Sequence, residues 1–140
     1  MADSPLFSVI VAFKEPGIEV EECLRHLFES VETNYEVILL PDSPMAEVKG
    51  LYAHPSVRIA PTGDVGSARK LDAGAFASEG RYLAFIDDAC RPEPYWLTYA
   101  RQAFEREANL AAVCGPARTP ASAPFVARAC AASAYSRFTG

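Results

Sequence analysis

Short apolar runs, each closed by polar or turn-forming residues, are the main pattern along this chain. Runs of four to eight such residues, rich in β-branched and aromatic side chains, are typical of buried strands. The run Tyr82–Ile86 is apolar at every position, so we expect a parallel strand that is covered by helices on both faces. Strands are predicted over residues 6–13, 35–40, 57–60, 82–86 and 110–114.

Helical periodicity fills the intervals between these runs. Within residues 18–32, apolar side chains recur at spacings of four, three and four, which predicts one buried helical face that ends at Val31. Pro94 suits the first position of a helix that should run to about Glu107, with Leu97 facing inward. Helices are predicted over residues 18–32, 67–78, 94–107 and 124–138, with a weak helix or irregular crossover over 45–53. The alternation predicts an α/β fold: a mostly parallel sheet of about five strands with helices on both faces.

Composition and charge narrow the class of protein. A chain of 140 residues that is half apolar should form one domain and bury roughly two-thirds of its unfolded surface. The net charge of −5 comes from scattered acids, which argues against a nucleic-acid or anionic-membrane partner. No window approaches the ~18 apolar residues of a membrane span, and the N-terminus lacks a signal core, so a cytoplasmic location is expected. The cysteines form no CxxC pair and are expected to be reduced thiols.

Two adjacent carboxylates, Asp87 and Asp88, directly follow the apolar run 82–86. Acids at the end of a buried strand repel each other and lose hydration, so a cation usually lies between them. In open α/β sheets, ligands bind beyond the carboxyl ends of the strands. The joint interpretation is a metal ion that carries a phosphorylated ligand. The alternative is a pair of solvated acids in a turn.

The order of the motifs argues against three common nucleotide-binding folds. The dinucleotide fingerprint requires GxGxxG after the first strand, where residues 13–17 read FKEPG. The segment Gly66-Ser-Ala lacks the Gly-Lys-Ser/Thr ending of a Walker A loop. A receiver-like domain would carry its acidic pair after the first strand, whereas here the pair follows the fourth.

Five segments, in this order, resemble the family 2 glycosyltransferases, which are nucleotide-sugar-dependent enzymes with the GT-A fold. They are residues 8–13 (SVIVAF), 36–43 (EVILLPDS), 70–74 (KLDAG), 77–88 (ASEGRYLAFIDD) and 112–116 (AVCGP). The resemblance covers nearly the whole chain and implies a Rossmann-like GT-A architecture. It also implies transfer of a sugar from a nucleotide diphosphate, expected to be a UDP-sugar, to an unknown glycan, lipid or protein acceptor.

The resemblance assigns two residues to the nucleobase. Asp42 matches the acid that accepts a hydrogen bond from the uracil ring, and a carboxylate suits an imide N–H. Its alternative role is to cap a turn before Ser43 and Pro44. Phe13 matches an aromatic residue that contacts the base, and core packing explains this residue equally well.

Four further residues are assigned to the ribose, the diphosphate and a metal ion. Lys70 and Asp72 match a helix-opening motif that faces the ribose and diphosphate. Lys70 could neutralise phosphate charge, with Arg69 as a second candidate, or it could be a solvated helix lysine. Asp87 and Asp88 match the first two places of a DxD-type motif, which binds ribose and, through Mg²⁺ or Mn²⁺, the diphosphate.

The sequence departs from the family pattern at two places and lacks an expected segment. Ala89 replaces the last, metal-ligating acid of the DxD-type motif, which weakens the expected metal site, and Pro41 replaces the first acid of the pair after the second strand. The general base and the acceptor half are expected beyond Gly140, and neither Asp64 nor Glu93 is singled out as a base. Residues 1–140 are therefore expected to form a donor-binding domain. The alternatives are a non-catalytic nucleotide-sugar-binding module or pseudoenzyme and, more distantly, a sugar nucleotidyltransferase.

Overall fold

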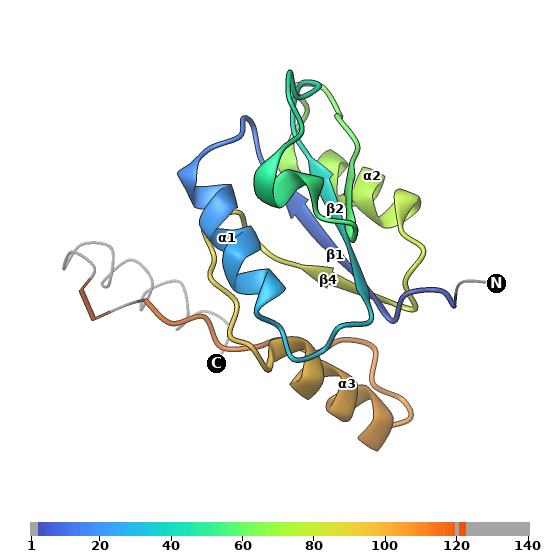
Figure 1. Ribbon diagram of the computed structural model, residues 1–140. Helices are drawn as coiled ribbons and strands as arrows, with labels where there is room; N and C mark the ends of the chain where they lie inside the picture. The colour runs from blue at the N-terminus through green and yellow to red at the C-terminus, as the bar shows by residue number, and fades with distance from the viewer. Residues whose placement is uncertain (1–2, 120, 123–140) are drawn as a thin grey trace. The chain divides into compact units, whose positions relative to one another are not determined.

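A parallel four-stranded sheet lies at the centre of the first of two compact units, residues 1–108 and 109–140 (Figure 1). The computed structural model describes residues 3–119 and 121–122. The strands are β1 (Phe7–Ala12), β2 (Tyr35–Leu40), β3 (Val57–Ile59) and β4 (Tyr82–Phe85). Their order is β3-β2-β1-β4, and every neighbouring pair is parallel. This arrangement confirms the predicted α/β class.

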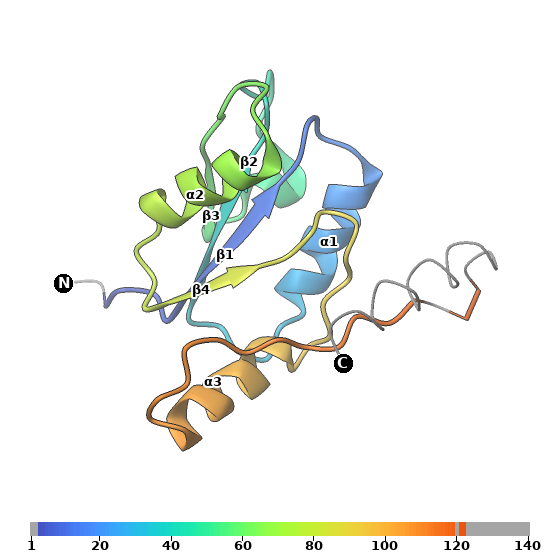
Figure 2. The ribbon, with the colours of Figure 1, turned by 180° about the vertical axis from the view of Figure 1, so that it is seen from behind.

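Helices cover both faces of the sheet, as predicted (Figures 1 and 2). The helices are α1 (Ile18–Phe28), α2 (Ser67–Ala77), α3 (Trp96–Arg106) and a short 3₁₀ helix, η1 (Gly50–Ala53). Because side chains alternate along a strand, β1 supplies Val9 and Val11 to one face and Ile10 to the other. The first face packs against α1 and Leu97 of α3, and the second against α2.

The first helix is shorter than its apolar pattern predicted. It ends at Phe28, and Val31 is 52% exposed rather than buried. The backbone N–H of Val31 donates to the carbonyl of Pro94 at 2.8 Å instead of continuing the helix. Periodicity alone does not reveal a contact with a residue so distant in the sequence.

The prediction that the fourth strand is covered on both faces is wrong. β4 lies at one end of the sheet, and Leu83 and Phe85 are 43% and 51% exposed. They are paired in register with Ser8 and Ile10 of β1, which places them on the α2 face of the sheet. Because α2 packs against β1 and β2, it leaves this face of β4 open.

The predicted fifth strand is also absent from the described residues. Residues 110–114 have no strand partner there, and residues 109–119 and 121–122 of the second unit form no helix or strand. An apolar run predicts a strand only if another strand is available to pair with it, which the run itself does not show. The helix predicted over 124–138 lies outside the described residues. In the part of the chain that the structure describes, no helix is long and apolar enough to cross a membrane.

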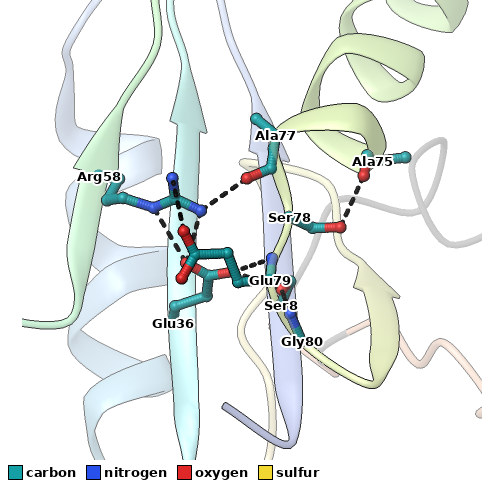
Figure 3. A network of polar contacts seen from close by, with 8 residues as sticks. All are labelled: Ser8, Glu36, Arg58, Ala75, Ala77, Ser78, Glu79 and Gly80. Carbon is teal, nitrogen blue, oxygen red and sulfur yellow. Dashed lines mark hydrogen bonds and ion pairs between the residues drawn. The ribbon is translucent and has the colours of Figure 1, made fainter. Parts of the chain in front are cut away.

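A polar network around the buried side chains of Ser8 and Glu36 fixes the connection between α2 and β4 (Figure 3). Glu36, at the start of β2, accepts hydrogen bonds from the Ser8 hydroxyl at 2.6 Å and the Glu79 backbone N–H at 2.7 Å. Its second oxygen pairs with the guanidinium of Arg58 on β3, which also donates to the Ala77 carbonyl. The pKa of Glu36 is lowered because these donors outweigh the burial that opposes ionisation. The network therefore joins three strands to the segment that leads into β4.

Gly80 makes the closest backbone approach in this connection. Its N–H donates to the Ser8 hydroxyl at 2.8 Å. A Cβ atom at this position would lie 2.5 Å from the backbone nitrogen of Ser8 and 2.7 Å from the carbonyl carbon of Phe7. Only glycine allows this approach, which sets the entry of β4 beside β1 and hence the position of the acids that follow β4.

Candidate functional site

The carboxyl ends of β1 and β2 carry the first part of the site. The backbone N–H of Phe13 donates to the carbonyl of Leu40 at 3.2 Å, and that of Asp42 donates to the carbonyl of Lys14 at 3.1 Å. These bonds continue the pairing of the two strands beyond their ends. The segments that follow β1 and β2 therefore leave the sheet side by side, at the edge where open α/β sheets bind ligands.

Lys70 of α2 reaches into this edge and is almost fully buried. Its side chain is 6% exposed. The ammonium donates to the carbonyl oxygens of Phe13 at 2.6 Å and Leu40 at 3.2 Å, and it forms an ion pair with Oδ1 of Asp42. Lys70 is therefore not a solvated helix lysine. The Asp42 carboxylate pairs with this lysine and accepts no other hydrogen bond from the described residues, so it does not cap the turn before Ser43 and Pro44.

An open pocket of about 620 Å³ lies beside Asp42. The turn after β1 and the loops after β2 and β3 line it, and Lys14, Asp42, Gly63 and Asp64 all contribute to the wall. The N–H of Gly63 donates to the carbonyl of Asp42 at 2.8 Å, and the positive φ of +81° at Gly63 favours glycine there. Sequence analysis missed Lys14, whose only signal is a basic residue directly after the first strand.

The remaining predicted base contact, Phe13, packs inward. Its side chain is 5% exposed and belongs to the main hydrophobic cluster, together with Tyr52 and Leu97. This position fits the core-packing alternative, and contact with a base stays a prediction. Asp72, predicted to face the ribose or diphosphate, is exposed on α2, as is Arg69.

Asp87 and Asp88 follow β4 in a turn held by the backbone and by α1. The N–H groups of Ala89 and Cys90 donate to Oδ1 and the carbonyl oxygen of Asp87, at 2.9 and 3.0 Å. The buried thiol of Cys23 in α1 contacts the same carbonyl at 3.7 Å. Burial is the main cause that raises the pKa of Cys23 to about 12, so this thiol stays protonated.

The two acids repel each other, as expected from their order in the sequence. Burial, the charge of Asp87, a hydrogen bond with Asp87 and the charge of Glu19 together raise the pKa of Asp88. A divalent cation would relieve this repulsion, and carboxylate oxygens are its preferred ligands. Among the described residues no group of three or more acids, histidines or cysteines could hold a metal ion. Two carboxylates still suit Mg²⁺ that is also bound by the phosphates of a ligand.

The structure thus brings some of the predicted residues together and separates others. Phe13, Asp42 and Lys70 meet where β1 and β2 end. Asp87 and Asp88 form a second group after β4, and neither is in the wall of the pocket beside Asp42. Both groups follow the carboxyl ends of parallel strands, which is where open α/β sheets bind ligands.

Comparison with known families identifies the chain. Residues 8–130 match the family model described as Glycosyl transferase family 2. The chain belongs to glycosyltransferase family 2. Membership in this family confirms the resemblance seen in the sequence. A search of curated proteins gives no match.

Three solved structures are similar to this chain in fold. The S. aureus TarS 1-349 structure aligns with a TM-score of 0.63 and 18% identity, covering 71% of this chain and 32% of that chain. The S. aureus TarS structure aligns with a TM-score of 0.61 and 17% identity, covering 71% of this chain and 19% of that chain. The structure of S. aureus TarS 1-349 in complex with UDP-GlcNAc aligns with a TM-score of 0.60 and 18% identity, covering 71% of this chain and 31% of that chain. At these identities the likeness establishes the fold, and this chain spans about a third or less of each TarS chain.

Proposed function

We propose that this chain forms the nucleotide-sugar-binding part of a family 2 glycosyltransferase and that its donor is a UDP-sugar. The observation that carries the proposal is the carboxylate of Asp42, which an ion pair holds in the wall of the open pocket beside β1 and β2. The UDP-GlcNAc complex of TarS, a structure with the same fold, supports this class of donor.

The chemistry of Asp42 favours uracil over cytosine. An ionised carboxylate only accepts hydrogen bonds, and uracil presents an N–H at ring position 3 where cytosine presents an acceptor. A cytosine in this place would set two acceptors against each other. We therefore infer that the site prefers UDP over CDP by about tenfold or more, which corresponds to the loss of one charge-assisted hydrogen bond.

The diphosphate and the metal ion belong to the second group of residues in this proposal. Asp88, with Asp87, would hold Mg²⁺ or Mn²⁺ together with the phosphates. When bound, the ion would offset the negative charge that develops on the departing nucleotide. Lys14, in the pocket wall, adds a positive charge on the same edge of the sheet. Asp72 stays a predicted ribose or diphosphate ligand.

Sugar transfer also needs a general base and an acceptor site, which we expect in residues other than those described here. The acceptor, whether glycan, lipid or protein, and a cytoplasmic location stay parts of the proposal. A non-catalytic nucleotide-sugar-binding module is the second candidate, because Ala89 occupies the place of the last acid in the metal motif. The two candidates share donor binding and differ in sugar transfer, so an assay of transfer from a UDP-sugar distinguishes them.

Calorimetric titration with UDP and CDP in the presence of Mn²⁺ tests the nucleotide assignment. We expect Asp42→Asn to lose most of the preference for UDP, because an amide both donates and accepts and so matches either base. The matched control is Asp64→Asn, a second acid in the pocket wall, which should keep the preference. If the folded wild-type protein binds no nucleoside diphosphate, both candidate functions are wrong.

A further inference from the structure

The ammonium of Lys70 has no donor left for a ligand. A lysine side chain has three N–H groups. The structure gives it three acceptors, namely the carbonyl oxygens of Phe13 and Leu40 and the carboxylate of Asp42. With the side chain 6% exposed, a phosphate could bind only if one of these buried contacts were broken.

The position of Lys70 is fixed by the packing of α2 against the sheet. A Cβ atom at Gly74, one turn along the same helix, would lie 2.5 Å from Cγ2 of Ile10 and 2.8 Å from Cδ1 of Leu40. This close contact holds α2 against β1 and β2. The lysine side chain therefore bridges the ends of both strands from a helix that packs closely against them.

The ion pair leaves half of the Asp42 carboxylate available. Lys70 donates to Oδ1, and no described residue donates to Oδ2. The pocket lies beside this side chain. The lysine thus fixes the orientation of the carboxylate, while the second oxygen can accept a hydrogen bond from a ligand.

We propose that Lys70 is a positioning residue that acts through Asp42 to set the recognition of the nucleobase, and that it does not bind phosphate. This inference rests on the proposed uridine-nucleotide site. It departs from the role in phosphate neutralisation that the sequence suggested for this lysine. The two roles differ in how the loss of affinity in a Lys70 variant depends on the number of phosphates in the ligand. A lost phosphate contact would weaken the binding of UDP but not of uridine, whereas a lost base contact would weaken both equally.

The decisive experiment compares uridine, UMP and UDP as ligands of the full chain. Affinities are measured for the wild-type protein, for Lys70→Met and Lys70→Gln, and for Lys49→Met as the control. Lys49 is an exposed lysine whose ion pair is with Glu47, outside the pocket. Thermal melts identify the variants that fold.

We expect both Lys70 variants to lose affinity by the same factor, roughly tenfold, for all three ligands, since the lost contact concerns the base. The preference for UDP over CDP should fall as well, and Lys49→Met should change neither.

A loss of affinity that grows from uridine to UDP would overturn the inference and leave the proposed function intact. If the wild-type protein binds no uridine compound, the proposed function fails, and the inference fails with it. Should both Lys70 variants fail to fold, the ¹⁵N signal of the Lys70 ammonium in the wild-type protein gives the same answer. An equal shift with uridine and UDP supports the inference, and a shift with UDP alone contradicts it.

Discussion

At the scale of single residues, the charged groups at the ligand-binding edge differ in whether the protein itself neutralises them. Asp42 has Lys70 as its partner, and both side chains are largely buried. Asp88 lies beside Asp87 and near Glu19, and these negative charges add to burial in raising its pKa. A charge that loses hydration is tolerated where it is paired, so Asp88 beside Asp87 would gain more from a bound cation than Asp42, which is paired with Lys70.

This difference predicts the effect of restoring an acid at position 89. Ala89→Asp should raise the Mn²⁺-dependent affinity for UDP by very roughly tenfold, because it adds a carboxylate ligand to the Asp87–Asp88 pair. Without metal the same change should weaken UDP binding, since a third acid then repels the diphosphate. Titrations with and without Mn²⁺ measure both effects. Unchanged affinity under both conditions would contradict a metal site at this turn.

Single residues were predictable from the sequence only where their role follows from their order in the chain. The acids at 42, 87 and 88 follow strands, and the structure places them at the expected edge of the sheet. The burial of Lys70 could not be predicted, because its partners Phe13 and Leu40 lie 57 and 30 residues away. The same holds for the inward packing of the Phe13 ring, which the sequence left open.

At the scale of elements, the Glu36 network decides where β4 enters the sheet, and it should make stability depend on pH. The folded pKa of Glu36 is lowered, so its contribution is fully present above the usual pKa of the unfolded chain and is lost as pH falls through the folded pKa. Glu36→Gln should lower the free energy of unfolding at pH 7 by about 1–3 kcal/mol and flatten its decline below about pH 4.5. Urea denaturation at pH 7 and pH 3.5 measures this. An equal loss for the variant at both pH values would show that the charge of Glu36 contributes nothing.

The glycine in the same connection gives a prediction that is independent of charge. Gly80→Ala should destabilise the fold by about 1–3 kcal/mol, because the new methyl group would meet backbone atoms of β1 that cannot move aside. Gly66→Ala is the matched control, since a Cβ atom there meets nothing within 4 Å and its φ of −62° suits alanine. Chemical denaturation compares the two variants. Similar stabilities for both would argue against a steric role for Gly80.

The existence and order of the elements from β1 to α3 followed from hydrophobic patterns, whereas their exact ends and their coverage by other elements did not. The strand Tyr35–Leu40 was predicted with its observed bounds, since turn-forming residues close the run. The exposure of Leu83 and Phe85 depends on which part of the sheet α2 covers, and the predicted strand over 110–114 depends on a pairing partner. Both are properties of the assembled sheet, so no local pattern encodes them.

At the scale of the whole molecule, the candidate site belongs to one of the two compact units. β1, β2, β4 and α2, which position the two groups of site residues, all lie within residues 1–108. The chain's only tryptophan, Trp96, lies in α3 of the same unit. Its fluorescence therefore reports the unfolding of the unit that would bind the nucleotide, whatever the stability of residues 109–140.

A thermal melt followed by Trp96 fluorescence should thus respond to ligand in a defined way. A ligand that binds only the folded state stabilises it, by ~2.7 kcal/mol at about a hundred times its dissociation constant. For a unit of this size the increase corresponds to very roughly 5–15 °C in melting temperature. We expect this shift with UDP and Mn²⁺ together, a smaller one with UDP alone because the diphosphate then faces Asp87 and Asp88 without a cation, and the smallest with CDP and Mn²⁺. Equal shifts with UDP and CDP would contradict the role of Asp42 in base recognition, because only the acceptor pattern of the base differs between these ligands.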